Sequence, residues 1–205
     1  MPQLLLFSDL HCDVGAAERL VQRAQDESID ILVGAGDFGI CRERTELVIN
    51  VLRQSELPAV MVPGNAESVQ ELRAACAGWE NCHALHGSGT EINGIPFWGV
   101  GGGIPVTPFG SWSYDFDEAT AQQMLADCPS EGVLVLHSPP LDCCDADSRG
   151  VVRGSAAIRQ CIERCVPKLA VCGHIHSSWE RIERIGDTTV IKAGPRGMIF
   201  SLPGG

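Results

Sequence analysis

Residues 3–11 read QLLLFSDLH, a short apolar run that stops at a carboxylate and an imidazole. An apolar run of this length between turn-forming residues is typical of a buried strand. The segment 15–28, GAAERLVQRAQDES, follows with apolar residues on one face, which predicts an amphipathic helix. A strand, a polar strand end and a helix therefore form a unit, and this unit recurs along the chain.

The same alternation predicts further strands and helices. The strands are expected over 29–37, 58–65, 132–140 and 168–176, and the helices over 43–55, about 67–77, about 117–127 and 155–165. Ser155 is a suitable N-cap for the last of these helices. Strands joined by helices imply right-handed βαβ units and a largely parallel sheet, so the expected fold class is α/β.

The middle and the end of the sequence differ from this pattern. Residues 90–101 place an Asn93-Gly94 turn between β-prone segments, which predicts a hairpin. Residues 179–202 are expected to form antiparallel strands with a turn near Gly186-Asp187. Because no internal repeat or linker interrupts the sequence, we expect a single domain over residues 1–205.

The loop expected over about 101–116 is rich in glycine, proline and aromatic residues. The glycine-rich run at 99–105 lacks the Lys-Ser/Thr pair of a P-loop, so a phosphate-loop interpretation is weak. The aromatic side chains that follow are Phe109, Trp112, Tyr114 and Phe116. They either stack on a planar ligand group as a lid or anchor the loop to the core, and the sequence leaves both interpretations open.

The composition restricts the class of partner. Apolar residues make up 44% and charged residues 20% of the chain, which is ordinary for a globular enzyme or binding domain. The net charge of −11 argues against a nucleic-acid partner, because such proteins neutralise phosphates with clustered Lys and Arg. No apolar run approaches the roughly 20 residues of a membrane-spanning helix, and the first residues do not resemble a signal peptide. We expect a cytoplasmic protein that acts on a small ligand, with no membrane partner.

The ten cysteines are expected to be reduced thiols, because no secretory signal precedes them. Their spacing does not predict a zinc site: Cys161 and Cys165 have no second matching pair, and Cys143 and Cys144 are adjacent. Most of them are expected to be small buried apolar residues, with a redox role of Cys143-Cys144 as a minor alternative.

Metal-ligating side chains follow five of the predicted strands directly. They are Asp9, His11, Asp37, Asn65, His137, His174 and His176. The carboxyl ends of strands in open α/β sheets are where such folds build their sites. Glycines at 36, 64 and 173 precede three of these side chains and permit close backbone approach.

Each of these residues alone has an ordinary explanation, such as a turn, a helix cap or a buried histidine. Their coincidence is more informative, since four of the six histidines of the chain stand at strand ends. Carboxylate, imidazole and amide donors without a required thiolate suit Mn, Fe or Zn. Seven donors are too many for one tetrahedral ion but suit two divalent ions that share a carboxylate.

The ordered motifs Asp9-x-His11, Gly36-Asp37, Gly64-Asn65, His137 and Gly173-His174-x-His176 resemble the calcineurin-like metallophosphoesterases. The resemblance spans about residues 4–178, and the stretch HSPPLD resembles the small bacterial-type members. It implies two packed mixed β-sheets flanked by helices, an αββα sandwich. It also implies a small phosphoester as the substrate.

The resemblance further implies a division of the seven residues between two ions. Asp9, His11 and His176 would hold the first ion, Asn65, His137 and His174 the second, and Asp37 would bridge them. Asp37, Asn65 and His137 would be the catalytic residues, and a hydroxide that bridges the metals would attack the phosphorus.

Position 66 departs from the pattern of the family, whose third motif usually reads Gly-Asn-His. A histidine at this position can protonate the leaving group, a step typically worth about 10²–10⁴-fold in rate, whereas Ala66 cannot. We therefore expect diesters to be favoured over alkyl monoesters, with His83 or His86 as the candidates for a replacement acid. The alternatives are a catalytically weak protein that binds metal and phosphate, or an interaction scaffold of the same fold.

Overall fold

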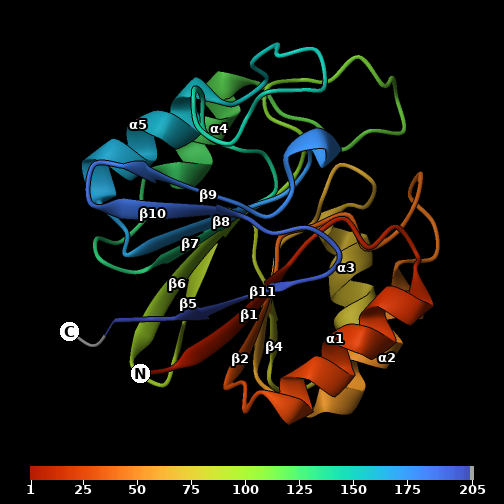
Figure 1. The fold of residues 1–205 in the computed structure, drawn as a ribbon. Helices are drawn as coiled ribbons and strands as arrows, with labels where there is room; N and C mark the ends of the chain where they lie inside the picture. Colours follow the sequence, from red (N-terminus) through yellow and green to blue (C-terminus); the bar gives the residue numbers. More distant parts are fainter. Residues whose placement is uncertain (204–205) are drawn as a thin grey trace.

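The computed structural model describes residues 1–203, apart from the side chain of residue 178, as two β-sheets between two layers of helices (Figure 1). The first sheet contains, in spatial order, β11 (Met198–Ser201), β1 (Gln3–Phe7), β2 (Ile31–Gly34), β3 (Ala59–Met61) and β4 (Cys82–Ala84). The second contains β5 (Ser88–Ile92), β6 (Ile95–Val100), β7 (Val133–Leu136), β8 (Leu169–Cys172), β10 (Thr188–Lys192) and β9 (Arg181–Ile185).

Both sheets are mixed. Strands β1 to β4 run parallel, and β11 pairs antiparallel with β1. In the second sheet β6, β7, β8 and β10 run parallel, whereas β5 and β9 are antiparallel strands at the two edges. The two mixed sheets flanked by helices confirm the predicted fold class.

The helices connect the strands and cover the outer face of each sheet. On the first sheet lie α1 (Val14–Asp26), α2 (Thr45–Leu52) and α3 (Val69–Cys76). On the second lie α4 (Glu118–Leu125) and α5 (Ala156–Cys165), and two 3-10 turns span Arg53–Ser55 and His176–Ser178. Ser155 caps α5 as predicted, since its Oγ accepts a hydrogen bond from the backbone N–H of Ile158 at 3.2 Å.

Three apolar clusters hold these four layers together. The cluster between the sheets contains alternate residues of the strands, such as Leu4 and Leu6 of β1 and Val133 and Val135 of β7. The intervening strand residues face the helices, where Leu5 packs with the α1 residue Leu20. Every residue of β2, β7 and β8 is buried, as expected for parallel strands covered on both faces.

The hairpin between β5 and β6 has the predicted turn. Asn93 and Gly94 both have positive φ, at 53° and 76°, and this conformation gives the two-residue turn that matches the twist of a hairpin.

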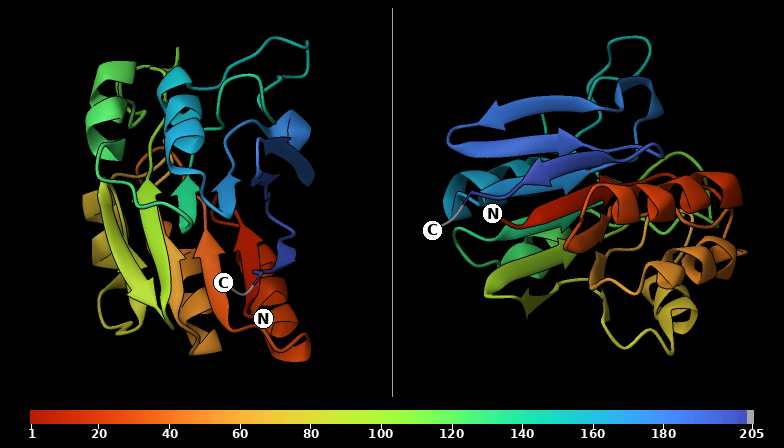
Figure 2. Two further views of the ribbon diagram at one scale, coloured as in Figure 1. Left: turned by 90° about the vertical axis from the view of Figure 1, so that its left-hand side faces the viewer. Right: turned by 60° about the horizontal axis from the view of Figure 1, so that its bottom comes forward.

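Two features of the sheets were not predicted. Strand β4 is a three-residue edge strand, and β11 leaves the antiparallel tail to pair with β1 in the other sheet. Consequently the two ends of the described chain lie side by side (Figure 2).

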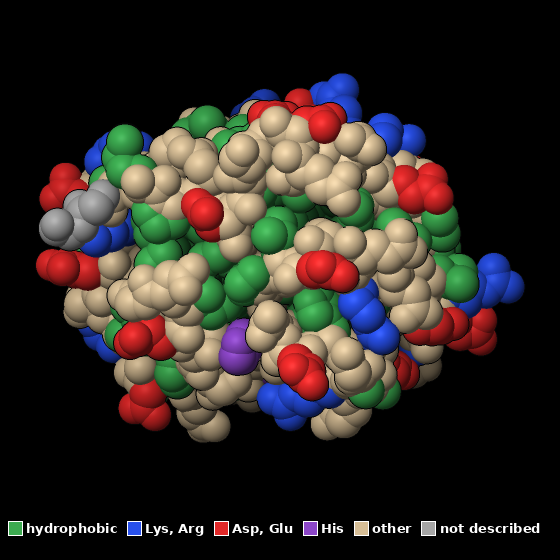
Figure 3. Space-filling view, turned by 90° about the horizontal axis from the view of Figure 1, so that it is seen from below, with side chains coloured by type: hydrophobic (Ala, Val, Ile, Leu, Met, Phe, Trp, Pro, Cys, Tyr) green, Lys and Arg blue, Asp and Glu red, His purple; other side chains and the backbone are tan. Residues whose placement is uncertain are grey.

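Charged groups of both signs are interspersed on the surface. Figure 3 shows the underside of the molecule in Figure 1, where acidic and basic side chains surround a partly apolar centre. Lysine and arginine do not gather into one patch on this face of the described chain. Within residues 1–203, the structure contains no helix that is long and apolar enough to cross a membrane.

Candidate metal centre

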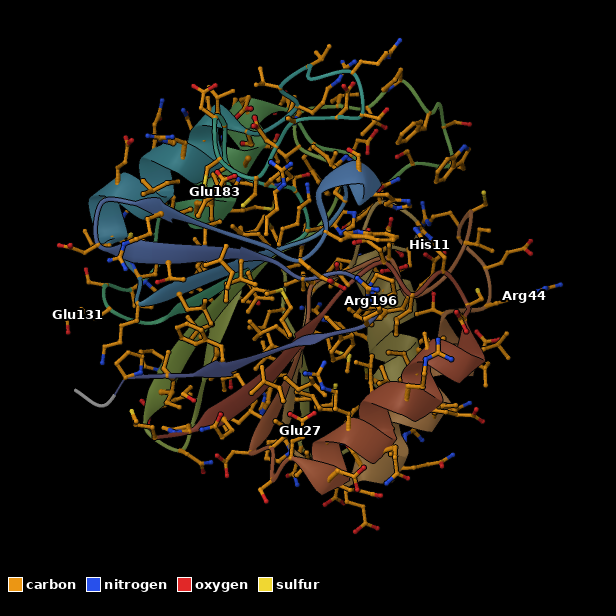
Figure 4. All side chains as sticks on the ribbon, viewed as in Figure 1. His11, Glu27, Arg44, Glu131, Glu183 and Arg196 are labelled. Carbon is orange, nitrogen blue, oxygen red and sulfur yellow. The ribbon has the colours of Figure 1, made fainter. Side chains whose placement is uncertain are left out.

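The side chains that follow the strands meet where the two sheets come together. The first sheet supplies Asp9 after β1, Asp37 after β2 and Asn65 after β3, and the second supplies His137 after β7 and a histidine pair after β8. Figure 4 shows the nearby His11 on the side of the molecule opposite the chain termini. The parallel strands of both sheets therefore deliver their polar ends to one place, as the sequence predicts.

Asp37 lies in the middle of the group. Its Oδ2 is 3.5 Å from His11 Nε2 and its Oδ1 is 3.4 Å from His137 Nε2, so each oxygen faces a different imidazole. The backbone N–H of Ala66 donates to Oδ1 at 2.8 Å and fixes the orientation of the carboxylate. Burial alone would raise the pKa of Asp37, but the attraction of His137 outweighs it and holds this pKa well below its usual range.

On the Oδ2 side of Asp37, His11, His176 and Asp9 converge. His11 Nε2 and His176 Nε2 are 3.2 Å apart, and His176 Nε2 is 3.6 Å from Asp9 Oδ1. The other oxygen of Asp9 accepts hydrogen bonds from Ser8 Oγ and from Trp179 Nε1, at 2.5 and 3.1 Å. Asp9, His11, Asp37 and His176 form a group whose ligand atoms all lie within 4.8 Å of one another, as holding a metal ion requires.

On the Oδ1 side, the amide oxygen of Asn65 faces two histidines. It lies 3.2 Å from His137 Nε2 and 3.0 Å from His174 Nδ1. The amide orientation follows from Ser113, whose hydroxyl donates to Asp115 at 2.8 Å and therefore accepts from Asn65 Nδ2 at 3.1 Å. The Asn65 oxygen is thus directed to the centre of the group.

The chemistry of these contacts fits a bound cation. His137 Nδ1 lies 2.8 Å from the carbonyl oxygen of Ala35, so Nδ1 carries the proton of the neutral ring and Nε2 presents a lone pair. That lone pair faces the oxygens of Asn65 and Asp37, which are also acceptors. Three acceptors around one point require positive charge between them. A proton can also supply this charge: burial lowers the pKa of His137, but the combined attraction of Asp37, Asp9 and the Ala35 carbonyl group raises it to about 9.

Several predicted ligands have an unusual backbone conformation. Positive φ angles occur at Asp9 (56°), His11 (43°), Asp37 (59°) and His174 (72°). A side-chain-bearing residue in this region costs on the order of 1 kcal/mol or more, and such residues concentrate at functional sites. Four of the seven predicted ligands therefore have a strained backbone conformation, which is typical of residues at functional sites.

The predicted role of the glycines before these ligands is confirmed at Gly36 and Gly64. Gly36 has φ of 89°, and a Cβ atom there would lie 2.6 Å from His137 Nδ1. A Cβ atom at Gly64 would overlap the Asp37 carboxylate. Any side chain at either position would displace a group that faces the centre.

Glu67, which was not predicted from the sequence, holds the backbone next to the site ligands. Its side chain is fully buried and accepts the backbone N–H groups of Asp37, Gly39 and Gly64 at 2.9, 3.0 and 2.7 Å. Burial and the adjacent Asp37 carboxylate raise the pKa of Glu67 to about 7, although the three N–H donors favour its ionised form. The available signal was an acidic residue two positions after Asn65, in the loop that follows β3.

The contacts of the two candidate replacement acids, His83 and His86, are made with residues other than the seven predicted ligands. His83 lies on β4 with its Nδ1 3.2 Å from Thr90 Oγ1. His86 Nδ1 accepts the backbone N–H of Gly101 at 3.2 Å, and its ring packs against Tyr114 and Phe116. Burial lowers the pKa of His86 to about 4, so this ring is neutral at neutral pH and is a poor general acid.

Replacing His86 with asparagine is expected to flatten the loss of stability in mild acid. The unfolded chain takes up a proton near the ordinary pKa of 6.5, and the folded chain does so only near 4. The free energy of unfolding of the wild type therefore falls as the pH drops through this window. Asparagine keeps an acceptor for Gly101 without titrating. Urea unfolding of both proteins at pH 7 and pH 5 measures the difference, and equal losses would contradict the assignment.

The aromatic loop divides into an anchored part and an exposed part. Asp115 ties the loop together, because its carboxylate accepts from Thr107 Oγ1 at 2.6 Å and from Ser113 Oγ at 2.8 Å. Tyr114 and Phe116 meet edge to face beside His86, with ring centroids 4.8 Å apart. Phe109 and Trp112 instead stack on each other, with centroids 5.8 Å apart, and Phe109 is 51% exposed. Tyr114 and Phe116 therefore fit the anchoring role, and the lid role stays a prediction.

Comparison with known proteins identifies a family for this geometry. The family model described as the calcineurin-like phosphoesterase superfamily domain matches residues 3–201. None of the curated proteins compared with the chain matches it significantly.

Solved structures share the fold at low sequence identity. A Thermus thermophilus protein, TT1561, is 20% identical with a TM-score of 0.77, covering 95% of this chain and 90% of its own. Phosphopantetheinyl hydrolase from Mycobacterium tuberculosis is 18% identical with a TM-score of 0.62, and the coverages are 95% and 90%. A dimetal phosphatase from Danio rerio is 12% identical with a TM-score of 0.66, and the coverages are 95% and 88%. The resemblance inferred from the strand-end motifs is therefore confirmed.

Proposed function

The chain belongs to the calcineurin-like phosphoesterase superfamily of metal-dependent phosphoesterases, and we propose that it hydrolyses small phosphoesters with two divalent ions. The observation that carries this proposal is the position of Asp37, whose two oxygens face imidazoles on opposite sides. The carboxylate would bridge the ions. The proposal requires that hydrolysis of an aryl phosphodiester depends on an added divalent ion and is lost on chelation.

The remaining ligands divide into two sets around this bridge. Asp9, His11 and His176 converge on the Oδ2 side and would hold the first ion. Asn65, His137 and His174 converge on the Oδ1 side and would hold the second ion. Mixed oxygen and nitrogen donors suit Mn, Fe or Zn.

The chain's own groups prepare this centre before a substrate arrives. When bound, the ions supply the positive charge that offsets a phosphate and activates water for attack on phosphorus. Ala35 holds the imidazole of His137 with its Nε2 lone pair directed inward, and Ser113 holds the Asn65 amide with its oxygen inward. Because these groups are already oriented, little reorganisation accompanies the reaction.

The side chains around the centre support one class of substrate. Ala66 is only 2% exposed and has no acidic side-chain group, and the His86 ring is neutral at neutral pH. Neither residue can therefore readily protonate a poor alkoxide leaving group. Aryl and diester leaving groups need this assistance less. The stacked Phe109 and Trp112 next to Ser113 offer a planar surface for the ester group that leaves. We therefore propose diesters over alkyl monoesters.

Replacing Ala66 with histidine is expected to raise the turnover of an alkyl phosphomonoester on the order of 10²-fold, and that of a diester much less. The backbone N–H of Ala66 bonds Asp37, so a side chain at this position starts beside the centre. Steady-state kinetics on both substrates measure the effect, with Ala66→Phe as a control for volume without a proton donor. An equal rise on both substrates would contradict the role assigned to position 66.

A second candidate function is a protein that binds metal and phosphate without rapid turnover. The observation that favours it is that neither His86 nor position 66 offers an acidic side chain at neutral pH. Tight Mn²⁺ binding with no hydrolysis of either ester would select this function.

The compartment is proposed from the thiols. We propose a cytoplasmic location, because a reducing compartment would keep closely spaced thiols such as Cys76 and Cys82, with sulfur atoms 3.5 Å apart, from forming a disulfide.

A further inference from the structure

A cluster of three buried thiols lies in the helical layer over the second sheet. Cys161 and Cys165 stand one turn apart on α5, and Cys128 follows the end of α4. Cys161 and Cys165 are each 3% exposed, and Cys128 is 7% exposed. The sequence offered only the Cys161-x3-Cys165 pair, and the packing of α4 against α5 adds the third thiol.

The cluster lies apart from the Asp/His centre. The backbone N–H of Glu131 donates to the carbonyl oxygen of Cys165 at 3.4 Å, which places residue 131 beside the cluster. Figure 4 shows Glu131 at one side of the molecule and His11 at the opposite side. The thiols also belong to the apolar cluster between the second sheet and its helices.

The separation of the sulfur atoms matches a coordination geometry. The Sγ atoms of Cys161 and Cys165 are 4.0 Å apart, and all three Sγ atoms lie within 4.8 Å of one another. Three sulfur atoms in a plane around one ion, with metal–sulfur bonds of about 2.3 Å, lie about 4.0 Å apart. The thiols therefore need only small side-chain movements to ligate one ion together.

The surroundings offset the charge that thiolate ligands carry. Arg164 Nη2 lies 3.8 Å from Cys161 Sγ and donates to the carbonyl oxygen of Leu125 at 2.7 Å, so the guanidinium is fixed beside the sulfur. The positive charge of Arg164 is therefore placed to offset a thiolate at Cys161.

We propose that Cys128, Cys161 and Cys165 form a binding site for a monovalent copper ion. Three sulfur ligands without a nitrogen or carboxylate ligand select a soft ion, and Cu(I) accepts three-coordination. Zn²⁺ in structural sites takes four ligands, and the group of ligand atoms in the described residues contains three. Binding replaces the protons of the ligating thiols, which pass to solvent, and no oxidation step is involved.

The other thiol groups of the chain serve as internal controls. Cys143 and Cys144 are grouped with the carboxylate of Glu183, a harder ligand, and Cys76 and Cys82 form a pair of two sulfur atoms. Both arrangements are less suited to a soft three-coordinate ion. Copper bound at either of these groups would therefore contradict both the proposed preference for three sulfur ligands and the proposed location.

The test is a competition between the full-length protein and bathocuproine disulfonate for Cu(I) under anaerobic, reducing conditions. The wild type is expected to bind one Cu(I) per chain with an affinity that Cys161→Ser lowers on the order of 100-fold. Cys76→Ser, which removes a buried thiol outside the cluster, is expected to bind as the wild type does. Equal affinities of Cys161→Ser and the wild type would overturn the proposal.

A second measurement uses the wild type alone, in case the serine variant does not fold. Alkylation rates are compared with and without bound Cu(I) by peptide mapping, and copper-dependent protection is expected at Cys128, Cys161 and Cys165 alone, while the exposed Cys41 reacts equally in both states. X-ray absorption is expected to show three sulfur neighbours at about 2.3 Å. Protection of Cys143 and Cys144 instead, or neighbours other than sulfur, would place the ion elsewhere and overturn the proposal.

Discussion

Replacing Asp37 with alanine is expected to lower kcat/KM for a phosphodiester on the order of 10³-fold or more. The carboxylate faces both halves of the centre, at 3.5 Å from His11 and 3.4 Å from His137. Its removal deletes a ligand from both proposed ions at once. The histidines around it would then have no carboxylate to offset bound charge, so metal affinity is expected to fall together with activity.

Steady-state kinetics and the electron paramagnetic resonance of Mn²⁺-loaded protein measure this prediction. The wild type is expected to show the spectrum of two coupled ions, and the variant is expected to lose it. Asp187→Ala is the matched control, because it removes an exposed carboxyl group in the turn between β9 and β10 that is not one of the seven predicted ligands. Full activity of the Asp37 variant would exclude a shared carboxylate.

Replacing Glu67 with alanine is expected to have the largest effect on stability. Its buried carboxylate accepts three backbone N–H groups, from Asp37, Gly39 and Gly64. A buried donor without a partner costs about 1–3 kcal/mol, so the loss of three approaches the whole 5–15 kcal/mol that stabilises a typical domain. The free energy of unfolding, measured in urea, is expected to fall by at least about 3 kcal/mol.

Two further variants distinguish the loss of these three hydrogen bonds from the loss of a negative charge. Glu80→Ala removes an exposed carboxylate and is expected to leave the free energy of unfolding unchanged. Glu67→Gln keeps one acceptor oxygen but turns an amide N–H₂ toward N–H donors, so an intermediate loss is expected. If Glu67→Ala were as stable as Glu80→Ala, the three hydrogen bonds would not be holding the turns before Asp37 and after Gly64.

The parts of the fold that could be predicted share a local signal. Apolar runs such as 31–34 and 133–136 end at glycine or a polar residue, and each forms a buried parallel strand. Asp37 and His137 could be placed together because carboxyl ends of such strands meet at one edge. A two-residue Asn93-Gly94 turn carries its conformation in its own residues, so the hairpin was also readable.

The parts that could not be predicted depend on contacts between distant segments. Strand β4 has only three residues, all half-buried, which is too short a run to predict a strand, and it forms along the edge that β3 offers. Strand β11 pairs with β1 through backbone groups that any sequence has. Ser113 orients Asn65 from 48 positions away, and Cys128 joins Cys161 through helix packing. None of these pairings leaves a pattern within one segment.

The most direct measurement is the hydrolysis of bis-p-nitrophenyl phosphate and p-nitrophenyl phosphate by chelator-stripped protein during titration with Mn²⁺. We predict no turnover without metal, and turnover that rises until two ions are bound per chain and is faster on the diester. The seven converging side chains would then hold a working two-ion centre. Turnover by the stripped protein, or saturation of both ion sites without hydrolysis of either ester, would contradict the proposed function.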